Sequence, residues 1–493
     1  LRIERYYKVK VIEINELSDI EEKLTFLNKN FDGNIYCKKD EVARGLLWAK
    51  WSNKKLIIDE NASEIDCLLR NNGKGLIVIE SNNDITDIIA SNYASSLDVD
   101  VKFTRKFELS EVKDIDRLII NWKRESSYGA YLKVKDIVNT ELGNIEIEKY
   151  KYATLFTEGV SYGAILNNVI PCSHVLRSIN EDVFIFNNIF YEQDNTCIGS
   201  SVIFSPQPDD LGDYPKLESK YINDSLYENK YFVKRLFEKD ATVDAFDFYV
   251  AHYPYDILHI CSHGGEIDGY YVIQEFVDRE GKKHVVEFEE IVGFSPYVGG
   301  YYNVVRKEFF RFLDGYEWMS KELEDQHFEK FIFDDMLKAL ASDSDRSIVS
   351  RSKIDYLVEG SCHVKCYDDI HQGQFHSIAS LGSPFIFNNT CTSWREFSAQ
   401  LIAGGCRAYI GTLWNVGNKV AYESACLFYD NAFKENTINA VNVMVNNIED
   451  EGYKDIYVFC GLHFTTIKKM SSLSNREVIN KIIVSLQKWI DYM

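Results

Sequence analysis

The feature that most constrains this chain is an alternation of short apolar runs with segments of helical periodicity. Apolar runs of strand type fall at 182–191, 200–206, 255–262, 383–391, 406–414 and 455–461. Most of them are separated by helix-forming segments at 217–237, 240–252, 393–404 and 418–435. An earlier unit of the same kind, "GLIVIE", "ITDIIASNYASSL" and "VDVKF", covers residues 75–105. Strands separated by helices are typical of a mainly parallel sheet with both faces covered, so the sequence predicts an α/β fold.

The length of the chain predicts more than one domain. At 493 residues, the chain exceeds what one hydrophobic core usually holds. We place a boundary near residue 150, with a smaller α/β domain over 1–150 and the stronger alternation over 151–493. Residues at about 278–380 interrupt that alternation and are interpreted as an insertion. Within it, "KKHVVEFEEIVGF" predicts a hairpin, and residues 307–341 predict helix.

Charge and cysteine usage exclude several classes of protein. The formal net charge of −21 disfavours direct binding of nucleic acid, since phosphate recognition needs a basic surface. Basic or mixed-charge protein partners are easier to accommodate. No run reaches the ~18 apolar residues of a membrane span. The 11 cysteines are scattered singly, which indicates a reduced, cytoplasmic protein rather than a disulfide framework.

Two of the predicted strands end in side chains that can do chemistry. His263 stands near the end of "ILHICSHGG", and Cys391 stands at the end of "FIFNNTC". In parallel sheets the functional site lies at the carboxyl ends of the strands, so neighbouring strands would bring the two residues together. A helix after Cys391 would favour its thiolate, and the imidazole could act as base and then acid. Gly264 lets the backbone approach closely, and its amide with that of Cys391 could stabilise an oxyanion.

Taken together, several motifs resemble the caspase-like cysteine peptidases, and specifically their CHAT-domain subfamily. "EKDATVDAF" followed by "YDILHICSHG" is similar to the helix and strand that carry the family's histidine. "FIFNNTCTS" resembles the nucleophile strand, and "LIAGGCRAYIGTLWNVGNKVAYESACLFYDNAF" resembles the elements that follow it. "DIYVFCGLHF" resembles the closing strand. The motifs keep the family's order and span roughly residues 150–465.

This resemblance implies a peptidase with a dyad of His263 as general base and acid and Cys391 as nucleophile. It also implies backbone oxyanion donors at Gly264 and Cys391 and no metal or organic cofactor. Prokaryotic members are often proteases in defence or signalling assemblies, switched on by a partner protein. In several relatives an inactive caspase-like domain precedes the active one, and the unit at 75–105 is compatible with such a degenerate domain.

The chain departs from the family pattern at two positions. Metacaspases carry an aspartate two residues before the nucleophile, where this chain has Asn389, so specificity for a basic P1 residue is not supported there. A family motif that tends to end in an acid ends here in Asn418. Candidates for substrate binding are Asn389, the acidic Glu266 and Asp268 that follow the glycines, and the aromatic Trp414.

Other interpretations of the sequence stay open. "CHVKCYDDIHQGQFH" brings Cys362, His363, Cys366, His371 and His376 into a short span, but its gaps are unlike those of a zinc finger, and we expect a loop near the substrate instead. His259 is expected to be a core histidine. A catalytically silent CHAT-like scaffold or signalling module is the alternative to the peptidase, and a hydrolase or transferase of another acyl compound is a third hypothesis.

Overall fold

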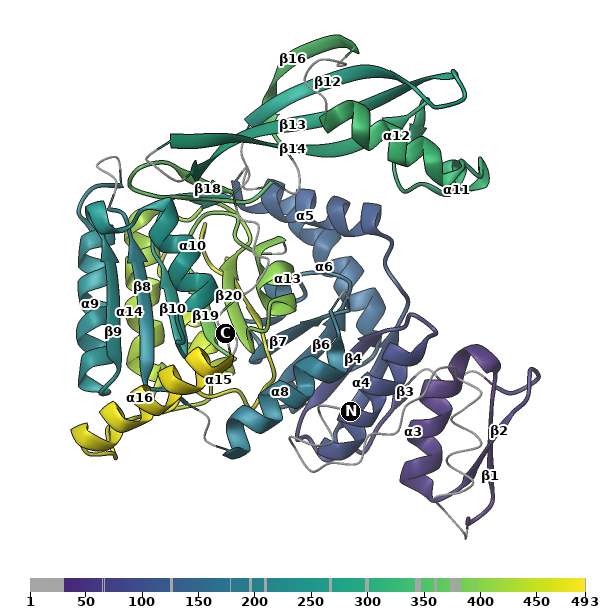
Figure 1. The fold of residues 1–493 in the computed structure, drawn as a ribbon. Coiled ribbons are helices and arrows are strands. Elements are labelled where there is room, and N and C mark those ends of the chain that lie inside the picture. Colours follow the sequence, from purple (N-terminus) through teal and green to yellow (C-terminus); the bar gives the residue numbers. More distant parts are fainter. Residues whose placement is uncertain are drawn as a thin grey trace.

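A large sheet, flanked by helices, runs through the computed structural model of this chain (Figure 1). The structure describes residues 31–492 except 64, 66, 125–126, 178, 195–196, 208–210, 266–267, 298–300, 342–346, 359–360, 373–377, 379–382 and 395. In the described residues this sheet has eleven strands. In spatial order they are β3 (Cys67–Leu68), β5 (Asp100–Thr104), β4 (Leu76–Glu80), β6 (Ala153–Thr157), β7 (Cys172–Leu176), β21 (Tyr457–Cys460), β20 (Ala408–Thr412), β19 (Phe385–Asn388), β10 (Ile257–Ile260), β8 (Ser200–Ser205) and β9 (Phe232–Phe237).

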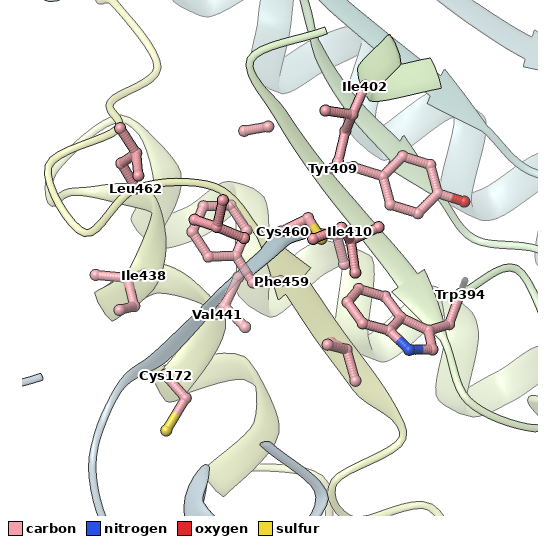
Figure 2. Close-up of a cluster of buried hydrophobic side chains, with 14 of the residues drawn as sticks. Cys172, Trp394, Ile402, Tyr409, Ile410, Ile438, Val441, Phe459, Cys460 and Leu462 are labelled. Carbon is pink, nitrogen blue, oxygen red and sulfur yellow. The ribbon is translucent and has the colours of Figure 1, made fainter. Parts of the chain in front are cut away.

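Apart from its edge strand β3, which is antiparallel to β5, the sheet consists of two parallel blocks joined at an antiparallel seam. Strands β5, β4, β6, β7 and β21 run parallel, as do β20, β19, β10, β8 and β9, whereas β20 and β21 are antiparallel. The carboxyl ends of the two blocks therefore face opposite ends of the molecule. Figure 2 shows the seam filled by buried apolar side chains, including Ile410 of β20 and Phe459 of β21. This packing makes the blocks share one core.

Helices cover both faces of the second block, which is formed by β20, β19, β10, β8 and β9. Strands covered on both faces are apolar along their length, and this explains the continuous apolar runs in the sequence. On one face, α9 (Tyr214–Glu228) packs beside α14 (Asn418–Ala432), whose Phe428 stacks on Phe385 of β19. On the other face, α10 (Val243–His252) places Phe246 against Phe204 of β8. The mainly parallel α/β fold predicted from the sequence is confirmed.

The first block contains the βαβ unit predicted at 75–105. β4, α4 (Ile85–Leu97) and β5 follow one another, and β4 and β5 pair in parallel, so that prediction is confirmed. The sheet continues across the boundary proposed at residue 150, because β4 also pairs with β6. The division into 1–150 and 151–493 stays a prediction.

The remaining elements surround this framework. Before β3, a small parallel pair, β1 (Asn34–Cys37) and β2 (Lys55–Ile58), packs on α3 (Val42–Ser52). The other helices outside the insertion are η1 (Lys39–Glu41), α5 (Leu109–Arg124), α6 (Tyr128–Leu142), η2 (Ile147–Lys149), α7 (Gly163–Leu166), α8 (Glu181–Asp194), η4 (Glu238–Asp240), α13 (Glu396–Ala403), α15 (Thr437–Asn446) and α16 (Asn475–Tyr492).

The insertion forms an antiparallel sheet that lies above the second block in Figure 1. Its strands are, in spatial order, β15 (Tyr316–Glu317), β14 (Tyr301–Leu313), β13 (Lys283–Tyr297), β12 (Asp268–Val277) and β16 (Ser347–Leu357), and α11 (Lys321–Asp325) and α12 (Lys330–Ala341) pack on it. His284, buried in this sheet, contacts carboxylates of two turns, with Nδ1 2.7 Å from Asp314 and Nε2 3.3 Å from Asp278. A smaller sheet of β11 (Gly264–Gly265), β17 (His363–Lys365) and β18 (Ile370–Gln372) connects the insertion to the second block.

The sequence prediction is wrong for the apolar run at 182–191. It was expected to be a strand, but it lies in α8. The buried positions in this run include Phe184, Ile185, Asn188 and Tyr191, which recur with helical spacing. Glu181 and Asp182 in the first turn favour the helix N-terminus. Short apolar runs are ambiguous between strand and helix, and here the helical period of burial decides.

Two predicted helices also contain strands. Residues 307–341 begin in β14, which turns at Asp314 and Gly315. Both turn residues have positive φ, +50° and +83°, so the Asp-Gly pair forms the two-residue hairpin loop that such pairs favour. The predicted helix at 217–237 ends at Glu228 in α9, and β9 follows it. In both cases a local turn signal ends the regular pattern.

Candidate active site

The structure brings the strand ends that carry His263 and Cys391 to the same edge of the sheet. Their strands, β10 and β19, are adjacent and parallel, with Ile260 paired to Asn388. The ladder continues past the strand ends, where the Asn389 amide donates to the carbonyl of Ile260 at 2.9 Å. His263 and Cys391 each stand three residues beyond the last pair. That the two side chains face each other stays a prediction.

The two glycines after His263 lie directly against the backbone at Cys391. A Cβ atom on Gly264 would meet Thr390 Oγ1 at 2.4 Å and the Cβ of Thr390 at 2.5 Å. Gly265 has a φ of +117°, and a Cβ there would meet the carbonyl oxygen of Cys391 at 3.0 Å. Gly264 is therefore required by close approach and Gly265 by its backbone conformation.

A strand from the insertion holds the histidine segment from its other side. Lys365 of β17 donates its amide to the carbonyl of His263 at 2.8 Å, and Ser262 Oγ donates to the carbonyl of Lys365. This pattern makes Gly264 and Val364 a non-hydrogen-bonded pair of the antiparallel ladder. The amide of Gly264 consequently faces away from β17. Its assignment as an oxyanion donor, like that of the Cys391 amide, stays a prediction.

Cys391 lies in a turn that is fixed by the neighbouring strand β20. Trp394 donates its amide to the carbonyl of Thr412 at 3.0 Å, and Thr412 Oγ1 donates to the carbonyl of Thr390 at 2.7 Å. Thr392 has a φ of +44°, which is unfavourable for a β-branched residue. Strain of this kind is held in place only by its surroundings and often accompanies functional sites.

The helix predicted after Cys391 is present, but it does not adjoin the thiol. α13 begins at Glu396, after the turn, so the turn and not the helix end surrounds Cys391. The side chain is partly exposed, and its Sγ lies 3.9 Å from the carbonyl oxygen of Val416. His263 is also partly exposed. Both members of the predicted dyad can therefore be reached from solvent.

Asn389 belongs to a buried polar network beneath this edge. Its Nδ2 donates to Glu218 Oε1 at 2.7 Å and to the carbonyl of Ala421 at 3.0 Å, while Tyr457 donates its hydroxyl to Oδ1 at 2.7 Å. His259 Nε2 lies 2.8 Å from the same Glu218 oxygen, so His259 is a core histidine, as expected. Because Asn389 uses its amide within the core, contact with a substrate would require these bonds to be exchanged.

Of the other predicted substrate-binding residues, Trp414 has a described side chain, whereas Glu266 and Asp268 do not. Trp414 is buried, and Lys123 of α5 lies over its ring with Nζ 5.3 Å from the centroid. A helix of the first block thus covers this side of the predicted site. Asp268 begins β12, but its side chain lies outside the described part of the chain, and so does Glu266 altogether. All three assignments stay predictions.

His363, to which the sequence gives no individual role within its Cys- and His-rich segment, lies at this edge. It pairs with Gly265 in the β11–β17 ladder, and its Nδ1 lies 2.6 Å from the carbonyl oxygen of Gly265. Burial lowers the pKa of His363, the hydrogen bond to Gly265 opposes that shift, and the charge of nearby His263 adds to it. The sequence signal for it is its place in the Cys- and His-rich segment, which is expected to form a loop near the substrate.

That segment does not gather its side chains around one point. Cys362 and Cys366 are buried, and burial raises the pKa of the Cys366 thiol far above its usual range. His371 packs edge-on against Phe246 of α10. His376 lies outside the described residues. Nowhere in the described part of the chain do three His, Cys, Asp or Glu side chains converge in a metal-binding arrangement.

Comparisons with known proteins add little to this site. No family model matches the sequence, and no curated protein matches it. Solved structures with a similar fold include the complex of Porphyromonas gingivalis RgpB pro- and mature domains, at 12% identity and a TM-score of 0.40. That alignment covers 81% of each chain. A likeness at this level is too distant to transfer a residue or an activity.

The helices were compared with what a membrane-spanning segment requires. None of those in the described ranges combines the length and the hydropathy that a bilayer crossing requires.

Proposed function

We propose that this chain is a cysteine endopeptidase with a dyad of His263 and Cys391. The observation that carries the proposal is the shared edge of β10 and β19. The ladder extends to Asn389 and Ile260, and the glycines after His263 lie against the side chain of Thr390 and the backbone of Cys391. The partial exposure of both side chains at neighbouring strand ends supports the proposal, since nucleophilic catalysis needs a thiol and an imidazole that can come within hydrogen-bond reach.

In the proposed reaction, His263 accepts the proton of Cys391, and the thiolate attacks the carbonyl carbon of the scissile peptide bond. The carbonyl oxygen becomes an oxyanion that the amides of Gly264 and Cys391 stabilise. His263 then donates its proton to the departing amine, which leaves an acyl-thioester on Cys391. Water, deprotonated by His263, attacks the thioester carbonyl, and the acid product departs as the thiol is restored. No metal or organic cofactor takes part.

The resemblance noted in the sequence supports a finer proposal about context. The substrate would be a protein, and a regulatory protein partner would switch the enzyme on in a cytoplasmic defence or signalling system of a prokaryote. The insertion is the proposed docking element, because its paired strands β12 and β16 neighbour in the chain the paired strands β11 and β17, which adjoin His263. Residues 1–150, with the βαβ unit at 75–105, would serve as the degenerate caspase-like domain.

Thiol reactivity tests the dyad without knowledge of the substrate. With iodoacetamide at pH 7, Cys391 should be alkylated faster than the other cysteines. Cys426 is the matched control, because it is also partly exposed while burial is the main cause that raises its pKa to about 12. His263→Ala should slow alkylation of Cys391 at least about tenfold, a lower bound set beneath the roughly 10²–10⁴-fold that a general base typically contributes, and Cys426→Ser should have no effect on it.

Cleavage of a peptide library and of co-purified proteins then separates the alternatives. The peptidase predicts cleavage that disappears in both Cys391→Ala and His263→Ala. A catalytically silent module predicts that Cys391 reacts no faster than Cys426. A hydrolase or transferase of another acyl compound predicts a reactive Cys391 without cleavage of any peptide bond. Either of these results would contradict the proposed function.

A further inference from the structure

We propose that His363 is a positioning residue for the dyad, which fixes the Gly264–Gly265 backbone through the carbonyl of Gly265. The inference rests on the proposed function, because it concerns the same site. His363 belongs to the insertion, and it is separated from His263 by the whole of the large antiparallel sheet in sequence.

The contact between the ring and the glycine determines which nitrogen carries the proton. A carbonyl oxygen can only accept, so Nδ1 of His363, 2.6 Å from the oxygen of Gly265, is the donor. Burial lowers the pKa of His363, which favours the neutral ring. The neutral ring can hydrogen-bond to the carbonyl of Gly265 without placing a second positive charge beside the imidazolium that His263 forms in the reaction.

The glycine pair needs such a restraint. Glycine has more backbone freedom than any other residue, and Gly265 uses it with a φ of +117°. Two consecutive glycines after the proposed base would otherwise let the peptide at Gly264 reorient. The ladder bond from Lys365 to His263 fixes one side of the pair, and the ring of His363 fixes the other. The close approach to Cys391 tolerates little movement.

His363 also stands where the insertion meets the site. β11 continues along the chain into β12, and β16 leads into β17. These strands are neighbours in both sheets, with Asp268 beside Leu357 and Gly265 beside His363. The same two segments of the chain thus pair in both sheets, and His363 lies in the pair that adjoins the histidine segment.

The test compares alkylation of Cys391 by iodoacetamide, from pH 5 to 9, in three variants. His363→Ala removes the donor and should lower the rate at pH 7 about fivefold, which corresponds to a typical net hydrogen bond. His363→Asn retains an N–H donor near the position of Nδ1 and should restore the rate to within about twofold. His371→Ala is the matched control, because it truncates a histidine of the neighbouring strand β18 that packs on Phe246.

The outcomes separate this inference from the proposed function. A loss in His363→Ala that His363→Asn reverses, with His371→Ala unchanged, supports a positioning role. Equal losses in His363→Ala and His371→Ala, or no rescue by His363→Asn, would show only structural support and overturn the inference. If His263→Ala itself leaves the alkylation of Cys391 unchanged, the proposed function fails and this inference fails with it. Thermal unfolding of each variant verifies that it is folded.

Discussion

A methyl group added at Gly264 should move His263 and Cys391, the two residues of the proposed dyad, apart. The added Cβ of Gly264→Ala would lie 2.4 Å from Thr390 Oγ1 and 2.5 Å from the Cβ of Thr390, whereas ordinary contacts fall at 3.4–4 Å. Rotation of the threonine cannot relieve the contact, because its Cβ is attached to the backbone. A third contact, at 2.9 Å, is with the carbonyl oxygen of His363. The strand ends must therefore move apart by about 1 Å.

The size of two effects follows from this geometry. Overpacking of a well-packed region destabilises the fold by about 1–3 kcal/mol. Displacement of reacting groups by about 1 Å can reduce a rate by roughly 10²-fold. Gly264→Ala should thus lower the thermal unfolding midpoint modestly and slow the alkylation of Cys391 far more. Gly129→Ala is the control, because no atom lies within 4 Å of its Cβ position.

A double substitution makes the reasoning more specific. Thr390→Gly removes both atoms that the new methyl group would meet, so Gly264→Ala combined with Thr390→Gly should recover part of the alkylation rate lost in Gly264→Ala alone. Favourable coupling between the two sites in a double-mutant cycle would identify the clash as the cause. An alkylation rate in Gly264→Ala equal to that of the unaltered chain would refute the argument that these strand ends meet.

Three further predictions concern buried charges. Asn389→Asp places a second carboxylate against Glu218 and should destabilise the fold by about 3–5 kcal/mol at pH 7 in urea unfolding; a stability equal to that of Asn389→Ala would contradict this. His284→Ala leaves two turn carboxylates without their shared ring, so amide exchange should accelerate at least tenfold in both turns of the insertion; unchanged exchange there would argue against the bridge. Burial raises the pKa of Glu80 from 4.5 to about 7, so its stabilising contribution is present below pH 4.5 and is lost as the pH rises through 7. Glu80→Gln should therefore gain roughly 3 kcal/mol relative to the unaltered chain between pH 4 and 8, and parallel pH profiles of unfolding would oppose it.

Much of the fold was predictable because strand and helix signals are local. The runs that became β8, β10, β19, β20 and β21 are continuous and apolar, which is typical of strands buried on both faces. The errors fall where local signals conflict. The run at 182–191 has β-prone residues in a helical pattern of burial, and the Asp-Gly turn at 314–315 interrupts a segment that otherwise resembles a helix.

The sequence by itself determined which chemical groups stand at strand ends, since the types of residue at 263, 264 and 391 are read directly and their strands are marked by composition. Only the tertiary structure decided that β10 and β19 are neighbours and that Asn389 is bonded into the core. The same holds for His363, which returns to the histidine segment after the whole insertion. Pairing and burial depend on contacts between residues far apart in the chain, and no periodicity within one segment encodes them.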